Sequence, residues 1–455
     1  MAAPIRSYRP GVKIIHKHGR ELAQQLGDLG QVTVSKNLYA PAGEFQIAFP
    51  DMPFHSGGGW PGGPNITERK SLYDIIDVLD PIEIWLKRWQ DGSATDNDWV
   101  PVLRGFVRSI GRQEQVGSDG RVQRQVVVSG HDCGAVFVME QIVNYLSAMA
   151  TGIPYPKVLE HLRQFELSAE AMKLPDFVWG LAYESTREIM ETAGWSFSKA
   201  FSVEKGYALP WVAFGSEGPV WEMLKRFTDT PWNEFYVREG ESQPELVFRP
   251  TPWRDIDDGW LPDVAEQPPF WTIPMRNVVS LNAHRDDSEV VIYVYVQNAN
   301  AHIGLNPHPL ESGFNIVPDA QRAKFGDRVQ TVQEFVGATK ESPTSLPEEP
   351  HQQMTLDYYD WLKDRVEWLK LAGRQIHQFE HGNVTIKGDP HIRAGDYIEV
   401  HRGVLVWSAY VVGVTHQYRP YYQYLTTIEY IRSNQWKKRQ GVGDGIWDLE
   451  RKQEA

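Results

Sequence analysis

Apolar and polar residues alternate with a period of two from Gly382 to Arg432, in the carboxyl-terminal part of the chain. Val384 and Ile386, for example, flank polar Thr385. Successive side chains of a strand point to opposite faces of its sheet, so this period is typical of strands with one buried and one solvent-exposed face. Turn sequences such as Gly388-Asp389-Pro390 separate the runs. The pattern predicts a small antiparallel meander of the kind that closes into barrels, with no polar constellation suited to chemistry.

The amino-terminal part of the chain shows the same alternation, and the middle part does not. Strands are expected in the segments 31–36, 44–50, 80–86, 102–110 and 125–132. After Gly134 the apolar period becomes helical, with a stripe formed by Val136, Met139, Val143, Leu146 and Ala150. A mostly helical stretch is expected up to about Phe227, and a further helix from Leu356 to Leu371.

The order of these segments resembles a known family. The run Arg393-x-Gly-Asp-Tyr-x-Glu-Val, a strand ending in Gly413-Val-Thr-His and a long final strand are similar to the second tube barrel of baseplate hub proteins. These are proteins of contractile-tail phages, and the family is related to the amino-terminal part of VgrG in injection machines. The amino-terminal strands follow the family's first barrel, and the middle segments 229–237 with 246–253, and 285–296, fit in order.

The resemblance implies an α+β, β-rich fold with two tube-type antiparallel β-barrels and helical and mixed insertions. At 455 residues the chain is too long for one core. We expect a first barrel in residues 1–135, a mainly helical insertion in 136–230, and strands of the second barrel in 231–300. An outer segment with a Pro-rich linker and a helix follows in 301–374, then the second barrel in 375–436 and a charged tail in 437–455.

Composition limits the possible functions. The chain carries 46 Lys and Arg against 59 Asp and Glu, a net charge of −13. Nucleic-acid binders usually present a basic surface, and the one basic run here is Lys437-Lys-Arg. A conduit for DNA should not hold phosphate, so an acidic chain is compatible with DNA passage, although acidity also serves solubility alone.

The sequence also bears on location and on cysteine chemistry. No apolar run reaches the length that crosses a bilayer, and the amino terminus lacks a signal-peptide core. We therefore expect assembly in a host cytoplasm and no membrane insertion. The single cysteine, Cys133, rules out internal disulfides, and we expect it to be a buried, small apolar residue.

Several groups of residues contain side chains of the types found in metal sites or catalytic triads. His16 and His18 alternate on one strand, but basic neighbours crowd them, so no metal site is predicted. The histidines near the last barrel are interpreted as polar surface or bore lining, and those in the loop around 300–309 as solvated; these are His377, His381, His391, His401 and His416, and His302 and His308. Ser129, His131 and Asp132 are too close in sequence for a catalytic triad.

A paired-carboxylate hydrolase is the main enzymatic alternative. Glu184, Glu188 and Glu191 share one helical face, and Glu140 lies in the same region. A glycosidase needs two carboxyl groups at a defined separation across a cleft, one of them with a raised pKa. A solvated acidic face explains the spacing more simply, so we predict no catalytic residues, no cofactor and no enzyme activity.

The function implied by the resemblance is structural. Three copies would form a ring that joins the tail tube to the central spike and lets DNA pass during ejection. The implied partners are the spike, the tail tube, the outer baseplate or wedge proteins and the tape-measure protein, in the tail baseplate of a virion. The alternatives are a tail-associated peptidoglycan hydrolase and a hub component of a type VI or extracellular injection machine.

Overall fold

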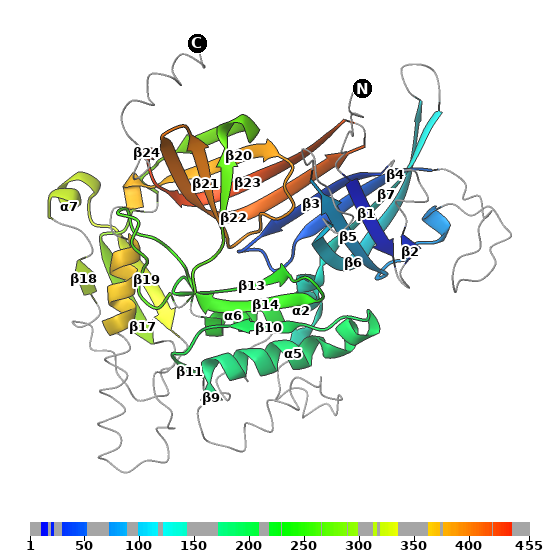
Figure 1. The fold of residues 1–455 in the computed structure, drawn as a ribbon. Coiled ribbons are helices and arrows are strands. Elements are labelled where there is room, and N and C mark those ends of the chain that lie inside the picture. Colours follow the sequence, from blue (N-terminus) through cyan, green and yellow to red (C-terminus); the bar gives the residue numbers. More distant parts are fainter. Residues whose placement is uncertain are drawn as a thin grey trace, which may run out of the picture.

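A computed structural model shows an α+β fold rich in strands (Figure 1). The structure describes residues 11–16, 20–21, 30–51, 72–88, 99–116, 122–142, 172–208, 218–228, 230–264, 266–288, 290–298, 313–315, 319–334, 363–373, 376–420 and 422–438. The expected loop at 53–64, the linker at 337–350 and the tail beyond Lys438 lie outside these residues. One 14-stranded sheet dominates, and it consists of two halves that meet at β3 and β22.

The amino-terminal half of this sheet has the strand order β3-β4-β7-β6-β5-β1-β2, and all its pairings are antiparallel. Its elements are β1 (Gly11–His16), β2 (Arg20–Glu21), β3 (Gln31–Asn37), β4 (Glu44–Pro50), β5 (Pro81–Lys87), β6 (Val100–Val116), β7 (Val122–Asp132) and the short η1 (Leu72–Asp74). Buried and less buried residues alternate along β1, β4 and β5, which confirms the expected period of two.

The inward face of this half encloses one apolar core. Six of its strands contribute, with residues such as Ile14, Val34, Ile47, Ile84 and Val128. Because one core contacts strands from both ends of this order, the sheet wraps around its own inner face. Tyr418 and Tyr424 of the other half complete the core.

The carboxyl-terminal half has the order β16-β20-β23-β22-β21-β15. Its elements are β15 (Phe270–Pro274), η4 (Met275–Asn277), β16 (Val278–His284), η7 (Ile376–Gln378), β20 (Glu380–Lys387), β21 (Tyr397–Arg402), β22 (Leu405–Arg419), β23 (Gln423–Ser433) and β24 (Lys437–Lys438). All its strand pairings are antiparallel except that of β15 with β21, which is parallel. Residues such as Ile273, Val384, Ile398, Trp407 and Ile428 form its core.

The two edge strands of this half, β15 and β16, are consecutive in the chain. Only η4 separates Pro274 from Val278, a span of at most about 14 Å. The outer strands of a flat six-stranded sheet would lie about 24 Å apart, so the sheet must curl strongly to let this connection form. Among the described residues no ladder joins β15 to β16, nor β1 to β3, so hydrogen bonding closes neither half into a ring.

A β-bulge in β22 changes one expected orientation. The period-two pattern predicts Tyr410, Val412 and Val414 on the face opposite to Val411 and Thr415. Tyr410 and Val412 do lie in a separate cluster from Val411, but Val414 shares the core of Val411. The register against β23 shifts between Val411 and Gly413, and this extra residue returns Val414 to the inner face. The expectation for Val414 was wrong for this reason.

A third region lies below the large sheet in the view of Figure 1, and both helices and strands contribute to its core. Its sheet has the order β10-β14-β13, and the helices α2, α5 and α6 pack against it. The bounds are η2 (Cys133–Ala135), α2 (Val136–Met139), β8 (Gln141–Ile142), β9 (Met172–Lys173), α5 (Leu174–Thr192), β10 (Ser198–Phe201), β11 (Tyr207–Ala208), β12 (Gly218–Pro219), α6 (Val220–Thr228), β13 (Asn233–Glu239) and β14 (Pro244–Pro250).

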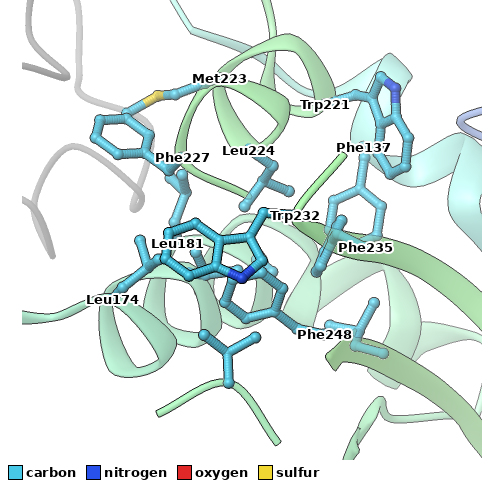
Figure 2. Packing of buried hydrophobic residues seen from close by; sticks show 14 of the residues in the cluster. Phe137, Leu174, Leu181, Trp221, Met223, Leu224, Phe227, Trp232, Phe235 and Phe248 are labelled. Carbon is cyan, nitrogen blue, oxygen red and sulfur yellow. The ribbon is translucent and has the colours of Figure 1, made fainter. Parts of the chain in front are cut away.

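Helix α5 has clear sequence signals at both ends. Pro175 lies in its first turn, where a missing N–H is not required. Gly194 follows the helix with a φ of 79°, and the Trp195 N–H donates to the Met190 carbonyl, as in a Schellman cap. Figure 2 shows its residues Leu174 and Leu181 beside Trp232 and Phe227, at the centre of the core.

Helix α2 is shorter than expected. The predicted stripe continued to Ala150, but the helix ends at Met139 and Glu140 is extended. Gln141 and Ile142 then pair with Pro219 and Gly218, so strand pairing replaces the next helical turn. Residues 143–150 lie outside the described part.

The range 231–300 divides among three sheets. β13 and β14 belong to the third region, and β17 (Tyr293–Asn298) pairs with β18 (Gly313–Asn315) and β19 (Val329–Glu334) in a sheet next to α7 (Asp319–Phe325). β15 and β16 alone join the second half of the large sheet, which is less than the sequence led us to expect. The domain boundaries themselves stay a prediction.

Residues 363–373 form a helix that overlaps the expected range of 356–371 and continues two residues beyond it. Val366, Trp368 and Leu369 of this helix are buried in the core of the third region. In the described part of the chain, no helix is both long enough and apolar enough to cross a membrane.

Replacing Ile428 by Asp should prevent folding of the second half. Ile428 is fully buried in its core, and an unpaired buried carboxylate costs several kcal/mol or more. We expect insoluble protein, or a large drop in the urea midpoint. Gln417→Asp, which places the same charge on an exposed position of β22, is the control and should fold normally. A soluble Ile428→Asp protein with an unchanged midpoint would contradict the core assignment.

Candidate functional site

The two halves of the large sheet meet at the seam between β3 and β22. Residues 32–37 pair antiparallel with 413–418, so strands almost 400 positions apart lie side by side. The Ser35 and Thr415 hydroxyl oxygens are 3.1 Å apart, and Asn37 Nδ2 donates to Glu429 Oε2 over 3.0 Å. The seam makes one continuous sheet out of the two halves.

A buried ionic network links this seam to the third region. Glu239, at the end of β13, accepts a hydrogen bond from Lys36 Nζ at 2.8 Å. Its other oxygen lies 3.3 Å from the guanidinium of Arg104, and Lys36 also lies 3.0 Å from Asp132. The Glu239 and Arg104 side chains are only 2% exposed, so two cations and two anions balance with little water around them.

The pKa values of the network follow from this balance. Burial alone would lower the pKa of Lys36, but the charges of Glu239 and Asp132 outweigh it and raise that pKa. Burial would likewise raise the pKa of Glu239, but Lys36 and Arg104 hold it below its ordinary value. Lys36 and Glu239 are therefore both charged at neutral pH.

The carboxyl-terminal half also contacts this network, through a second set of residues. The seam and the network together are called the junction below. Arg393 Nη1 donates to the Glu239 carbonyl at 2.6 Å. Arg249 of β14 binds Glu234 of β13 at 2.6 Å, and the Tyr410 hydroxyl of β22 donates to the other oxygen of Glu234 at 2.5 Å. The short strand β13 thus makes polar contacts with both halves of the large sheet.

A small cavity lies inside the junction. Its volume is about 40 Å³, and its lining includes Lys36, Asp132, Glu239, Arg393 and His416. A cavity of this volume has room for a water molecule, whereas pockets for small-molecule ligands are roughly ten times larger. Polar atoms that face the cavity can hydrogen-bond to such water, so the cavity suits a structural role.

His416 is the buried histidine of the seam. Its Nδ1 lies 3.1 Å from the Thr426 hydroxyl and 3.2 Å from that of Tyr424. Burial lowers its pKa from 6.5 to about 4, against the weaker opposing effect of Asp389. His416 is therefore neutral at pH 7.

The other histidines weighed from sequence do not gather in one site. His16 is buried against Asp80 at 2.7 Å. His391 pairs with Asp389 at 3.0 Å and His401 with Glu399 at 3.3 Å, on separate turns and strands. His377 contacts Phe325, and His381 lies near Asp286. His18, His302 and His308 lie outside the described residues.

The residues of triad type point to separate partners. His131 contacts Arg108 at 2.9 Å on the surface, while Asp132 pairs with Lys36 in the junction. Asp132 also caps η2 by accepting the Gly134 N–H. Cys133 is fully buried, which confirms its expected packing role, and its thiol donates to the Arg104 carbonyl. Burial raises the pKa of this thiol well above its ordinary value.

The acidic residues of the helical region fall into two groups. Glu184 and Glu191 both pair with Arg187 on the surface of α5, as expected for a solvated face. Partial burial and the nearby charge of Glu188 raise the pKa of Glu140. Neither Glu140 nor Glu188 lines the junction cavity.

Sequence reasoning did not identify the junction residues. Lys36, Arg104 and Glu239 each stand in strands whose pattern is otherwise apolar or alternating, and this was the one available signal. Arg104 within Val102-Leu-Arg-Gly-Phe is the clearest case, because a charged residue in an apolar run needs a buried partner.

Comparison with known proteins identifies structural neighbours. No protein-family model and no curated protein sequence matches the chain. A tail protein from Neisseria meningitidis MC58 is 12% identical with a TM-score of 0.49, covering 97% of this chain and 99% of its own. The 43 kDa tail protein of prophage MuSo2 from Shewanella oneidensis is 9% identical with a TM-score of 0.45, covering 93% and 97%.

A third neighbour is an E. coli component of the type VI secretion system, described as structurally similar to the T4 bacteriophage tail proteins gp27 and gp5. It is 10% identical with a TM-score of 0.40, covering 96% of this chain and 80% of its own. Two of these neighbours are thus described as tail proteins and the third as a secretion-system component.

Replacing Glu239 by Gln should destabilise the junction. The substitution keeps the shape but leaves Lys36 and Arg104 with one buried anion, and breaking a buried ion pair costs about 3 kcal/mol or more. Urea denaturation should show a lower midpoint. Glu241→Gln, two residues away with an exposed side chain, should stay within about 0.5 kcal/mol of the parent. Equal midpoints for both variants would show that the network contributes little.

His416 should make the protein less stable between pH 6.5 and pH 4. In this window the unfolded chain binds a proton at His416 and the folded chain does not, so stability falls as pH falls, by about 3 kcal/mol in total. We expect His416→Gln to lose less stability over this window than the parent protein. His401→Gln, at a partly exposed position of β21, is the matched control for replacing a histidine. Parallel pH curves for all three proteins would contradict the prediction.

Proposed function

We propose that this chain is a structural baseplate hub of a contractile tail. In this role three copies form a ring that joins the tail tube to the central spike, and DNA passes through the ring during ejection. Its partners would be the spike, the tube protein, the outer baseplate or wedge proteins and the tape-measure protein. The protein would reside in the tail baseplate of the virion after assembly in the host cytoplasm.

One observation carries the proposal. The segments whose order resembles the two tube barrels of hub proteins are the strands of the two halves of the large sheet. The amino-terminal segments correspond to β3, β4, β5, β6 and β7, and the carboxyl-terminal segments to β20, β21, β22 and β23. Each half curls around its own core, and the two halves lie side by side in one sheet.

This arrangement suits a protein that connects a three-fold assembly to a six-fold one. A closed ring of identical chains satisfies every subunit interface. If three chains surround an axis, their six curled halves can line a tube whose local pattern is close to six-fold. The seam keeps the two halves of each chain in fixed register, because slipping one residue would turn apolar side chains of β3 and β22 to the wrong face.

The charged groups of the junction favour a structural role over catalysis. Lys36, Arg104 and Glu239 are engaged with one another, and the cavity beside them is of water size. A net charge of −13 lets DNA pass without being held. A hub in a type VI or extracellular injection machine would use the same architecture and differ in its cargo.

The hydrolase alternative depends on one pair of carboxylates. Glu140 has a raised pKa beside Glu188, the direction that a general acid needs. A peptidoglycan clearing assay with the purified chain discriminates between the two functions. Turnover that Glu140→Gln abolishes would replace the hub proposal, and we expect no clearing.

The oligomeric state tests the hub directly. Analytical ultracentrifugation of the full chain at micromolar concentration, alone and with its spike protein, should give a species with the mass of three chains. The interface should be large and apolar enough to persist on dilution. A monomer under both conditions would overturn the ring.

A further inference from the structure

Two histidines and an aspartate converge at the free edge of the carboxyl-terminal half. His284, the last residue of β16, is the cross-strand partner of His381 in β20. Their imidazole rings lie 4.0 Å apart between centroids, and His381 Nε2 is 3.1 Å from Asp286 Oδ2. The three ligand atoms all lie within 4.8 Å of one another.

The surroundings hold the aspartate in place. Asp286 Oδ1 accepts the Ser288 N–H at 2.9 Å and also contacts the Ser288 hydroxyl, which leaves Oδ2 directed at His381. The adjacent Asp287 is held by Arg328 through its own carboxylate. Hydrogen bonds of this kind orient metal ligands, because they fix one oxygen and leave the other free to coordinate.

We propose that His284, Asp286 and His381 bind a divalent transition-metal ion of the Zn²⁺ class. Two imidazole nitrogens and one carboxylate oxygen form a ligand set that zinc and related ions prefer, and three protein ligands leave at least one position for water or another donor. A bound ion joins β16 to β20 at the edge of the sheet, where β16 has no second strand partner among the described residues.

The grouping distinguishes this place from ordinary His–carboxylate pairs. His391 with Asp389, and His401 with Glu399, lie in the same half and have similar separations. Among the residues that the structure describes, only His284, Asp286 and His381 bring three such ligands together. The backbone ladder sets the His284–His381 approach, so the site is largely formed before an ion arrives.

Co²⁺ and Zn²⁺ titrations of the full-length, untagged chain test the proposal. Co²⁺ should give a visible absorption band that saturates with the site, and Zn²⁺ should displace it and raise the melting temperature. His284→Ala and Asp286→Asn should each weaken Co²⁺ binding by about tenfold or more, since each removes one of three ligands. His401→Ala, which disrupts a two-ligand pair, is the matched control and should bind Co²⁺ as the parent does.

The possible results distinguish a specific metal site from the absence of one. Loss of the band in His284→Ala and Asp286→Asn, with circular dichroism unchanged and His401→Ala normal, supports the site. No saturable binding below millimolar metal, or equal binding by all four proteins, overturns it. None of these readouts depends on oligomeric state or on phage assembly, so the metal site can fail while the hub proposal stands.

Discussion

The strand β22 is the element on which the whole fold depends. One of its edges pairs with β23 along residues 410–419. The other edge pairs first with β21, up to Tyr410, and then with β3 from Gly413 onward. A strand has only two edges, so sharing one of them between two partners is what fixes the amino-terminal half against the carboxyl-terminal half. The bulge at Val412 lies where the partner changes, and it lets both faces of β22 be buried.

Buried charge adds a second constraint at the same place. Glu239 brings β13 to the seam, where Lys36 of β3 and Arg104 of β6 neutralise it. Such a network often contributes less stability than apolar side chains of the same volume would, because each ion must leave water. The network instead constrains geometry, because a misplaced β13 would separate the buried Glu239 carboxylate from both of its cations. Apolar contacts between Tyr236, Val247 and Tyr410 tolerate small shifts far better.

The seam at β22 and the outer edge of β16 have different surroundings. At the seam, the part of β22 that extends beyond β21 pairs within the chain with β3 of the amino-terminal half. At β16, the edge is open among the described residues, and a histidine pair with an aspartate stands there. Edge strands with unpaired backbone groups can pair with other chains unless another element covers the edge or a cross-link holds it. A hub that is built from repeated copies needs control of such edges, and a metal ion at β16 would supply it locally.

The sequence by itself determined the main strands of the two halves of the large sheet, most of their buried faces and the burial of Cys133. These features follow from neighbours two to four positions apart, and burial of apolar surface dictates them whatever the rest of the chain does. The tertiary structure alone decided which strands share a sheet. It placed β17 with β18 and β19, ended α2 at Met139, and turned Val414 inward through a bulge. It also joined Glu239 to Lys36, 203 positions away, and to Arg104, 135 positions away. Local periodicity carries no information about such contacts, because a charged residue reveals only that it needs a partner, and the fold decides which one.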